Sequence, residues 1–208
     1  MGMHRALAVG VAVLWLAGCA TRLPELPPAA GTPPSTSDPA QYTYLIGPGD
    51  SLNIFVWHNP DVSTTVTVRP DGKITTPLVE DLLVAGKTPT QVAREIEKVL
   101  STYIKEPMVT VMVGGFVGPY SEQIRVLGAA AQPQALPYRQ GMTLADVMIA
   151  VGGLNEFAAG NRARLIRFVD GERREFRLRI DDLLKDGDIS ANVDMLPGDT
   201  LIIPEAWF

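Results

Sequence analysis

One turn-and-strand pattern occurs near both ends of the sequence, and it constrains the fold more than any other feature. Its first copy is Gly47-Pro48-Gly49-Asp50, after which apolar residues alternate with others up to Trp57. Proline fixes φ and the glycine after it supplies the positive φ of a type II turn, so a half-buried strand should follow. The second copy is Leu196-Pro197-Gly198-Asp199, before residues 200–203. A single copy is ordinary turn chemistry, but two copies predict that the ordered structure lies between them.

The first 18 residues have the pattern of a lipoprotein signal peptide. Basic Arg5 precedes an unbroken apolar run over 6–16, which matches a signal-peptide core and is too short for an ordinary membrane span. The run leads into Leu16-Ala17-Gly18-Cys19, which resembles a bacterial lipobox, so we predict cleavage before Cys19 and lipidation of its thiol. The alternative is a buried apolar helix with an incidental cysteine. Because the sequence has one cysteine, it excludes an internal disulfide and a cysteine metal site.

Residues 19–40 are interpreted as a lipidated, proline-rich tether. Proline lacks a backbone donor, and the intervening small residues offer little apolar area to bury, so the segment should be extended. The prolines are Pro24, Pro27, Pro28, Pro33, Pro34 and Pro39. The residue after the cysteine is Ala20, and not the aspartate that keeps lipoproteins from moving on to the outer membrane. By resemblance to lipoprotein sorting, we expect a lipid-anchored protein on the periplasmic side of the outer membrane.

Residues 41–118 are predicted to form a small α+β domain. Alternating residues over 62–68 and 73–78 flank Arg69-Pro70-Asp71-Gly72, which predicts a β-hairpin. A helix should begin after Thr88, since Thr88, Pro89 and Gln91 have capping-box spacing. The apolar face of this helix is expected to carry Val92, Ile96, Val99, Leu100 and Tyr103. A strand over 108–113 should complete a domain of strands and one covering helix.

Residues 119–208 are predicted to form a second domain of the β-grasp type, with a sheet and a short helix. Strands are expected over 122–127 and 135–138. Thr143 and Asp146 should cap a helix that Gly152 and Gly153 end in left-handed conformations. The dipeptide Asp170-Gly171 predicts a hairpin between residues 164–169 and 173–179, and the second Pro-Gly-Asp turn should begin the last strand.

Four arginines lie close together in the second predicted domain: Arg173, Arg174, Arg177 and Arg179. Their functional interpretation is a contact with an anion or an acidic glycan. The alternative is a solvated strand face whose charge is balanced by Glu172, Glu175 and Asp181. The sequence favours this alternative, because charged residues on exposed strands are usually solvated.

The residues give no support for catalysis or for a cofactor. After cleavage His58 would be the one remaining histidine, so a histidine metal site and a Ser-His-Asp triad are not expected. The adjacent carboxylates Glu80-Asp81 and Asp181-Asp182 could serve a glycosidase only if the fold brought another carboxylate within about 5–9 Å. The formal net charge of −5 argues against nucleic acid as a partner. We therefore expect no enzyme, no metal and no cofactor.

In combination, these residues resemble the outer-membrane polysaccharide export lipoproteins. The matching residues of the first domain are Tyr44, Gly47-Pro48-Gly49-Asp50, Asp71-Gly72-Lys73-Ile74 and Pro107-x-Val109-x-Val111-x-Val113. Those of the second domain are Val126-x-Gly128, Ala150-Val151-Gly152-Gly153, Leu165-x-Arg167 and Leu196-Pro197-Gly198-Asp199. The resemblance implies a polysaccharide-export domain over 41–118 and an SLBB-like β-grasp domain over 119–208.

The resemblance also implies a function and partners. It implies a homo-oligomeric ring that exports capsular polysaccharide or exopolysaccharide, together with an inner-membrane polysaccharide co-polymerase and a separate outer-membrane β-barrel. The alternatives are a monomeric glycan-binding lipoprotein of the cell envelope and a carboxylate glycosidase. Two departures from the family pattern stand out: Glu80-Asp81 replaces a usual glycine, and the sequence ends at Trp207-Phe208, where longer members continue. We expect this short form to resemble exosortase-associated export proteins, with Trp207 and Phe208 as candidates for a partner contact.

Overall fold

The computed structural model of this protein describes residue 38 and residues 41–206. The predicted signal peptide, Cys19, most of the predicted tether, and the pair Trp207 and Phe208 lie outside the described residues. Buried apolar side chains form two clusters, one from Ile46 to Val111 and the other from Ile124 to Ile203. Each cluster joins strands to at least one helix, so each domain has its own core and the predicted α+β class is confirmed.

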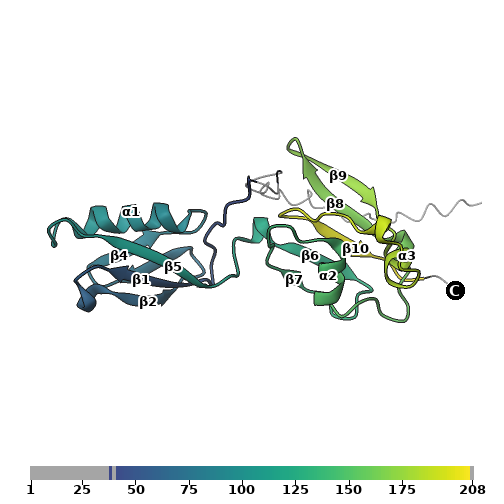
Figure 1. Ribbon diagram of the computed structural model, residues 1–208, viewed down its shortest axis with the longest axis horizontal. Helices are drawn as coiled ribbons and strands as arrows, with labels where there is room; N and C mark the ends of the chain where they lie inside the picture. The colour runs from purple at the N-terminus through teal and green to yellow at the C-terminus, as the bar shows by residue number, and fades with distance from the viewer. Residues whose placement is uncertain (1–37, 39–40, 207–208) are drawn as a thin grey trace, which may run out of the picture. The chain divides into compact units, whose positions relative to one another are not determined.

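The first domain contains a three-stranded antiparallel sheet, a separate two-stranded hairpin and one helix (Figure 1). Its elements are β1 (Ser51–Val56), a 3-10 turn (Pro60–Val62), β2 (Thr64–Thr67), β3 (Lys73–Thr76), β4 (Val79–Leu83), α1 (Pro89–Leu100) and β5 (Val109–Gly115). In the larger sheet β1 lies between β2 and β5. Leu52, Ile54 and Val56 of β1 are buried, as their alternation predicted. The strand that follows the first Pro-Gly-Asp turn is therefore the centre of this sheet.

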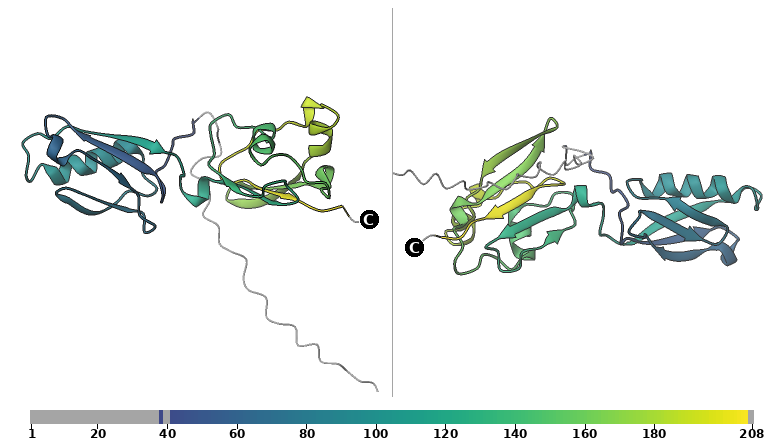
Figure 2. Two further views of the ribbon diagram at one scale, coloured as in Figure 1. Left: turned by 90° about the horizontal axis from the view of Figure 1, so that it is seen from below. Right: turned by 180° about the vertical axis from the view of Figure 1, so that it is seen from behind.

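Helix α1 begins at the predicted cap. The Thr88 hydroxyl accepts a hydrogen bond from the Gln91 N–H at 3.2 Å, and the Gln91 side chain accepts one from the Thr88 N–H at 2.9 Å. The helix runs alongside the strands of the first domain in both views of Figure 2. Its buried stripe centres on Ala93, Ile96 and Leu100. The prediction of a wider apolar face was wrong, because Val99 lies at the margin of this stripe and Tyr103 lies beyond the helix, and both are exposed.

The predicted hairpin between residues 62–68 and 73–78 was also wrong. Its turn forms, since the Gly72 N–H donates to the Arg69 carbonyl at 2.8 Å. Beyond the turn, however, β2 pairs with β1, whereas β3 pairs with β4. A second tight turn at Pro77-Leu78 joins β3 to β4, and the Gly72 carbonyl accepts hydrogen bonds from the backbone that follows β4. A turn sequence predicts where the chain reverses, but it does not determine which ladder each strand joins.

Leu78 occupies the tip of the β3–β4 hairpin with φ at 65° and a largely exposed side chain. A left-handed φ disfavours a residue with a β carbon by roughly 1–2 kcal/mol, which glycine avoids at the cost of more chain entropy. Leu78→Gly should therefore raise the free energy of unfolding by up to about 1 kcal/mol in a denaturant titration. Leu83→Gly is the matched control, because Leu83 is similarly exposed but lies within β4, so its substitution should be destabilising. A Leu78→Gly protein less stable than the original would contradict this assignment.

The second domain has a five-stranded sheet in the order β7-β6-β10-β8-β9. Its elements are β6 (Ile124–Gly128), β7 (Ala135–Leu136), α2 (Leu144–Ala150), β8 (Arg164–Val169), β9 (Glu172–Arg177), α3 (Ile180–Leu184) and β10 (Thr200–Ile203), with 3-10 turns at Tyr120–Glu122, Gly160–Arg162 and Ile189–Ala191. The last strand, β10, is central and runs parallel to β6, while the other neighbouring strands are antiparallel. Strand β10 thus lies between two antiparallel pairs, β6–β7 and β8–β9, which is the β-grasp arrangement that the family resemblance implied.

Helix α2 begins and ends at the predicted residues. The Asp146 carboxylate accepts hydrogen bonds from the Thr143 N–H at 2.9 Å and from the Thr143 hydroxyl at 2.7 Å. After the helix, Gly152 and Gly153 have φ values of 75° and 85°. Among the helices within residues 41–206, none has both the length and the apolar character that crossing a membrane requires.

Candidate functional site

The first Pro-Gly-Asp turn holds a fully buried carboxylate. Gly49 has a φ of 92°, as this turn requires, and Asp50 is 0% exposed. One carboxylate oxygen of Asp50 accepts hydrogen bonds from the Tyr44 hydroxyl at 2.6 Å and the Gly47 N–H at 2.9 Å. The other accepts from the N–H groups of Val117 at 2.7 Å and Gly118 at 3.0 Å. The carboxylate therefore connects the segment before β1 with the segment after β5.

These two segments approach too closely for a side chain at Gly47. A β carbon built there would lie 2.0 Å from the backbone carbonyl carbon of Gly118. The Tyr44 side chain is also held at this junction, and its burial, followed by its hydrogen bond to Asp50, raises the pKa of the Tyr44 hydroxyl well above its usual value. Tyr44 thus remains a hydrogen-bond donor at neutral pH. The geometry shows a clamp that ties together the two ends of the first domain.

The second Pro-Gly-Asp turn repeats the local geometry with a different partner. Gly198 has a φ of 78°, and the Leu196 N–H donates to the buried Asp199 carboxylate at 2.7 Å, as the Gly47 N–H does to Asp50. The Asp199 carboxylate also accepts hydrogen bonds from the Nε and Nη2 atoms of Arg167, at 2.8 and 2.7 Å. The same guanidinium donates to the Asp194 carbonyl at 2.8 Å. This bidentate ion pair fixes the start of the central strand β10 to β8.

The other predicted motif residues also lie at turns. Asp71 accepts a hydrogen bond from the Arg69 Nε atom at 3.1 Å, and its hydrogen bonds with Arg69 lower the pKa of the Asp71 carboxyl to about 2. Gly72, beside it, has a φ of 78°. Gly152 and Gly153 lie after α2 in the other domain. The motif residues thus occupy separate turns, and the structure does not bring them together around one shared cavity.

The structure separates the arginines that lie close together in sequence. Along β9, Arg173 and Arg177 are on one face of the sheet, and Arg174 is on the other. Arg174 lies 3.9 Å from Asp170. Arg179 lies beyond the strand and forms ion pairs with Asp182 at 3.0 Å and Asp188 at 2.9 Å. A common surface of all four arginines is therefore absent, whereas Arg173 and Arg177 remain together on one face.

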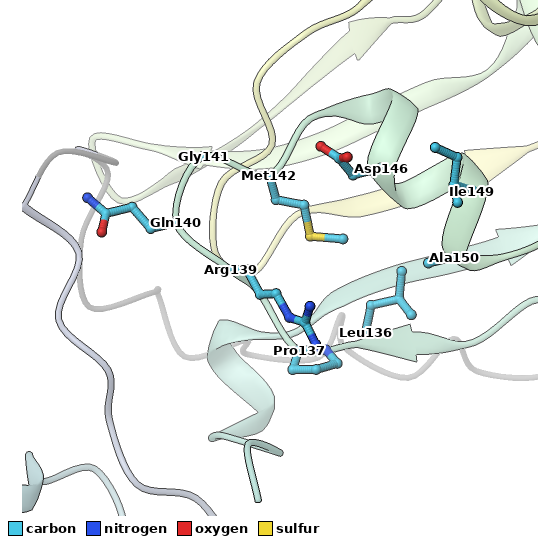
Figure 3. Close-up of a pocket in the computed structure, with 9 residues that line it drawn as sticks. All are labelled: Leu136, Pro137, Arg139, Gln140, Gly141, Met142, Asp146, Ile149 and Ala150. Atoms are coloured by element: carbon cyan, nitrogen blue, oxygen red, sulfur yellow. The ribbon is translucent and has the colours of Figure 1, made fainter. Parts of the chain in front are cut away.

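A hollow of about 460 Å³ lies between the segment after β7 and helix α2 (Figure 3). Met142 lies between Asp146 and Arg139 in this view, and Gln140 points away from the other labelled side chains. The hollow is lined by Leu136, Pro137, Arg139, Gln140, Gly141, Met142, Asp146, Ile149 and Ala150. Asp146 already serves as the helix cap, and its hydrogen bonds to Thr143 lower the pKa of its carboxyl. Sequence reasoning did not identify this hollow, because its lining combines a loop that has no regular pattern with one side of helix α2, and only the fold brings the two together.

The carboxylates considered for catalysis take part in structural contacts. Asp81 forms an ion pair with Arg69 at 2.8 Å, and Asp181 forms one with Lys185 at 2.7 Å. His58 stacks on Trp57, with 4.8 Å between ring centroids. Among the residues that the structure describes, no group of three or more His, Cys, Asp or Glu side chains is arranged to hold a metal ion. The site geometry thus offers binding surfaces and structural clamps.

Comparison with known protein families assigns both domains. Residues 38–114 match the family described as polysaccharide biosynthesis/export protein, and residues 123–176 match the SLBB domain. The first match begins three residues before the predicted start of the first domain at residue 41, and the second match lies between residues 119 and 208.

Two similar proteins are named "EPS I polysaccharide export outer membrane protein EpsA". The one from Ralstonia nicotianae is 29% identical over 187 residues, which cover 78% of this chain and 47% of the relative. The one from Ralstonia solanacearum is 30% identical over 180 residues, which cover 75% of this chain and 46% of the relative. The chain thus spans about half the length of the curated relatives that it matches.

Proposed function

Because this chain contains a polysaccharide biosynthesis/export domain followed by an SLBB domain, we propose that it is a periplasm-facing outer-membrane lipoprotein whose oligomeric ring exports capsular polysaccharide or exopolysaccharide. The observation that carries the proposal is the order of the two domains. Relatives named as polysaccharide export outer membrane proteins align with about three-quarters of the same chain. A transport role, without catalysis, agrees with the structural contacts that engage Asp81 and Asp181.

The proposed subunit acts with other components of the envelope. Its partners are further copies of itself, the polymer, an inner-membrane polysaccharide co-polymerase and a separate pore protein in the outer membrane. Trp207 and Phe208 are proposed to contribute to one of these contacts, since aromatic residues are enriched at the centres of protein interfaces. The two buried carboxylate clamps suit a subunit of fixed shape, because they hold the turns that begin the central strand of each sheet.

The direct test of the ring is the mass of the purified, delipidated protein in its native state. A ring predicts a single defined multimer, and chemical cross-linking should give a ladder that ends at the same multimer. A monomer at every protein concentration would instead favour the monomeric glycan-binding lipoprotein. In cells, deletion of the gene should abolish secreted polysaccharide, and the unaltered gene should restore it.

A lipid on Cys19 would attach the subunit to the membrane in this proposal. Each buried CH₂ group contributes about 0.8 kcal/mol, so several acyl chains give a stable anchor. Cys19→Ser should abolish labelling by an alkyne-tagged palmitate and leave the precursor uncleaved. Thr21→Ser, a matched change just beyond the proposed cleavage point, should leave both labelling and processing intact. Persistent labelling of the Cys19→Ser protein would show that the lipid is attached at another residue and would contradict the assignment of Cys19.

A further inference from the structure

The sheet of the second domain is covered by helices on one face only. Helices α2 and α3 bury their apolar side chains in the same core cluster as Val126, Leu165 and Leu201 of the strands. Both helices lie on one side of this sheet in the left view of Figure 2. Because side chains alternate along a strand, the neighbours of these core residues project from the opposite face, which we call the open face.

The open face is apolar at its centre. Ile166 of β8 and Ile202 of β10 lie there beside Phe168, and each of the three is partly exposed. Together with Tyr120 they line a hollow of about 400 Å³. Tyr120 itself is exposed over most of its side chain. This volume is sufficient for a flat, partly apolar group such as a sugar ring, which can bury its C–H face against the apolar floor.

Arginines from three strands surround this apolar centre: Arg125 of β6, Arg164 of β8, and Arg173 and Arg177 of β9. Within the described strands, Glu175 is the one acidic side chain on the same face, and it forms an ion pair with Arg164 at 2.9 Å. The open face is thus positively charged on a protein whose formal net charge is −5. Such a local reversal of charge indicates an anionic partner.

The arginines are also held in place. Arg125 donates to the Tyr120 carbonyl, and the Arg177 Nε donates to the Asn161 carbonyl at 3.0 Å. The Arg173 guanidinium lies over the Phe168 ring, 5.3 Å from its centroid. Hydrogen bonds to neutral carbonyls orient a guanidinium without cancelling its charge, so these groups are ordered for contact with an anion.

We propose that the open face binds a carboxylate-bearing segment of the exported polysaccharide, an inference that rests on the proposed function. Arg125 and Arg173 lie at the same hollow, where either guanidinium can bind a sugar carboxylate through two parallel hydrogen bonds. The apolar floor of Ile166, Phe168 and Ile202 then carries the sugar ring. The chemistry favours an acidic glycan, because its carboxylates complement the excess of arginine over acidic side chains on the strands of the open face.

The test measures binding of the purified full chain to fluorescent oligogalacturonate, with neutral dextran fragments of equal length for comparison. The protein should bind oligogalacturonate, bind more weakly as salt is added, and show no binding to dextran. Arg125→Gln/Arg173→Gln should weaken binding by roughly tenfold or more. Arg174→Gln/Lys98→Gln removes the same charge from the opposite face of the sheet and from helix α1 of the first domain, and it should change affinity less than about twofold. Circular dichroism should show all variants folded.

Each other outcome overturns the inference. Equal losses in both double variants would mean non-specific attraction, and unchanged binding in Arg125→Gln/Arg173→Gln would place the glycan elsewhere. Arginine-dependent binding to anionic lipid vesicles without binding to oligogalacturonate would identify a membrane contact. Failure of this inference remains distinguishable from failure of the proposed function. If gene deletion abolishes export but purified protein does not bind the acidic glycan through the open face, only the inference falls.

Discussion

Replacing Asp50 with alanine should lower the free energy of unfolding by about 3–5 kcal/mol, because it leaves a set of buried donors without an acceptor. The carboxylate is fully buried and accepts hydrogen bonds from Tyr44, Gly47, Val117 and Gly118. A water molecule in the space left by the carboxylate could accept hydrogen bonds from only some of these donors, since the donors converge from two backbone segments. Urea titration followed by circular dichroism measures the loss.

Two further variants separate the charge of Asp50 from its size. Asp50→Asn preserves the shape, but its NH₂ group would face N–H and O–H donors, so it should still lose at least about 2 kcal/mol. Asp61→Ala removes an exposed aspartate from the same domain and should change stability by no more than about 0.5 kcal/mol. If Asp50→Ala and Asp61→Ala proved equally stable, the clamp would have no energetic role.

The sequence predicted the Pro-Gly-Asp turns but not what their aspartates bind. Turn chemistry is local, so Pro48 and Gly49 are sufficient to predict the reversal and the strand that follows. The donors from Val117 and Gly118 lie 67 and 68 residues away from Asp50 along the chain. No spacing rule connects such distant residues, and neither donor is a side chain. The clamp therefore emerges only when the fold brings both segments together.

The difference between local and long-range interactions also explains why the helix starts were predicted better than the strand pairing. Capping by Thr88 and by Asp146 uses residues three positions apart, and both helix starts were predicted correctly. Strand partners depend on long-range pairing, which explains why β3 was assigned to β2 in place of β4. In the second domain, the hairpin at Asp170-Gly171 was predicted because its turn and its pairing coincide.

The arginine cluster on the open face could likewise be predicted from the sequence only in part. Sequence adjacency grouped Arg173 with Arg174, but alternation along β9 places them on opposite faces. Arg125 and Arg164 join Arg173 only because β6 pairs with β10, β10 with β8, and β8 with β9. Sequence patterns can predict which strand face is polar, but the cluster itself is a property of the assembled sheet.

Arg167→Leu should destabilise the second domain by about 3–5 kcal/mol, because it leaves the buried Asp199 carboxylate without its charged partner. The Arg167 guanidinium forms two hydrogen bonds with Asp199, at 2.8 and 2.7 Å. Arg164→Leu is the matched control on the same strand. Arg164 pairs with Glu175 near the surface, and both side chains are about half exposed, so its loss should cost less than about 1 kcal/mol.

The double variant Arg167→Leu/Asp199→Asn tests whether the unpaired charge is the cause. The amide oxygen of the substituted side chain can still accept a hydrogen bond from the Leu196 N–H, and no charge remains buried at the turn. The double variant should therefore be more stable than Arg167→Leu alone, which additive effects cannot produce when each single change is destabilising. Because each domain has its own core, hydrogen exchange should increase in β8 and β10 while β1 and β5 keep their protection. Additive losses, or equal loss of protection in both domains, would contradict a local ion pair that secures the central strand of the β-grasp sheet.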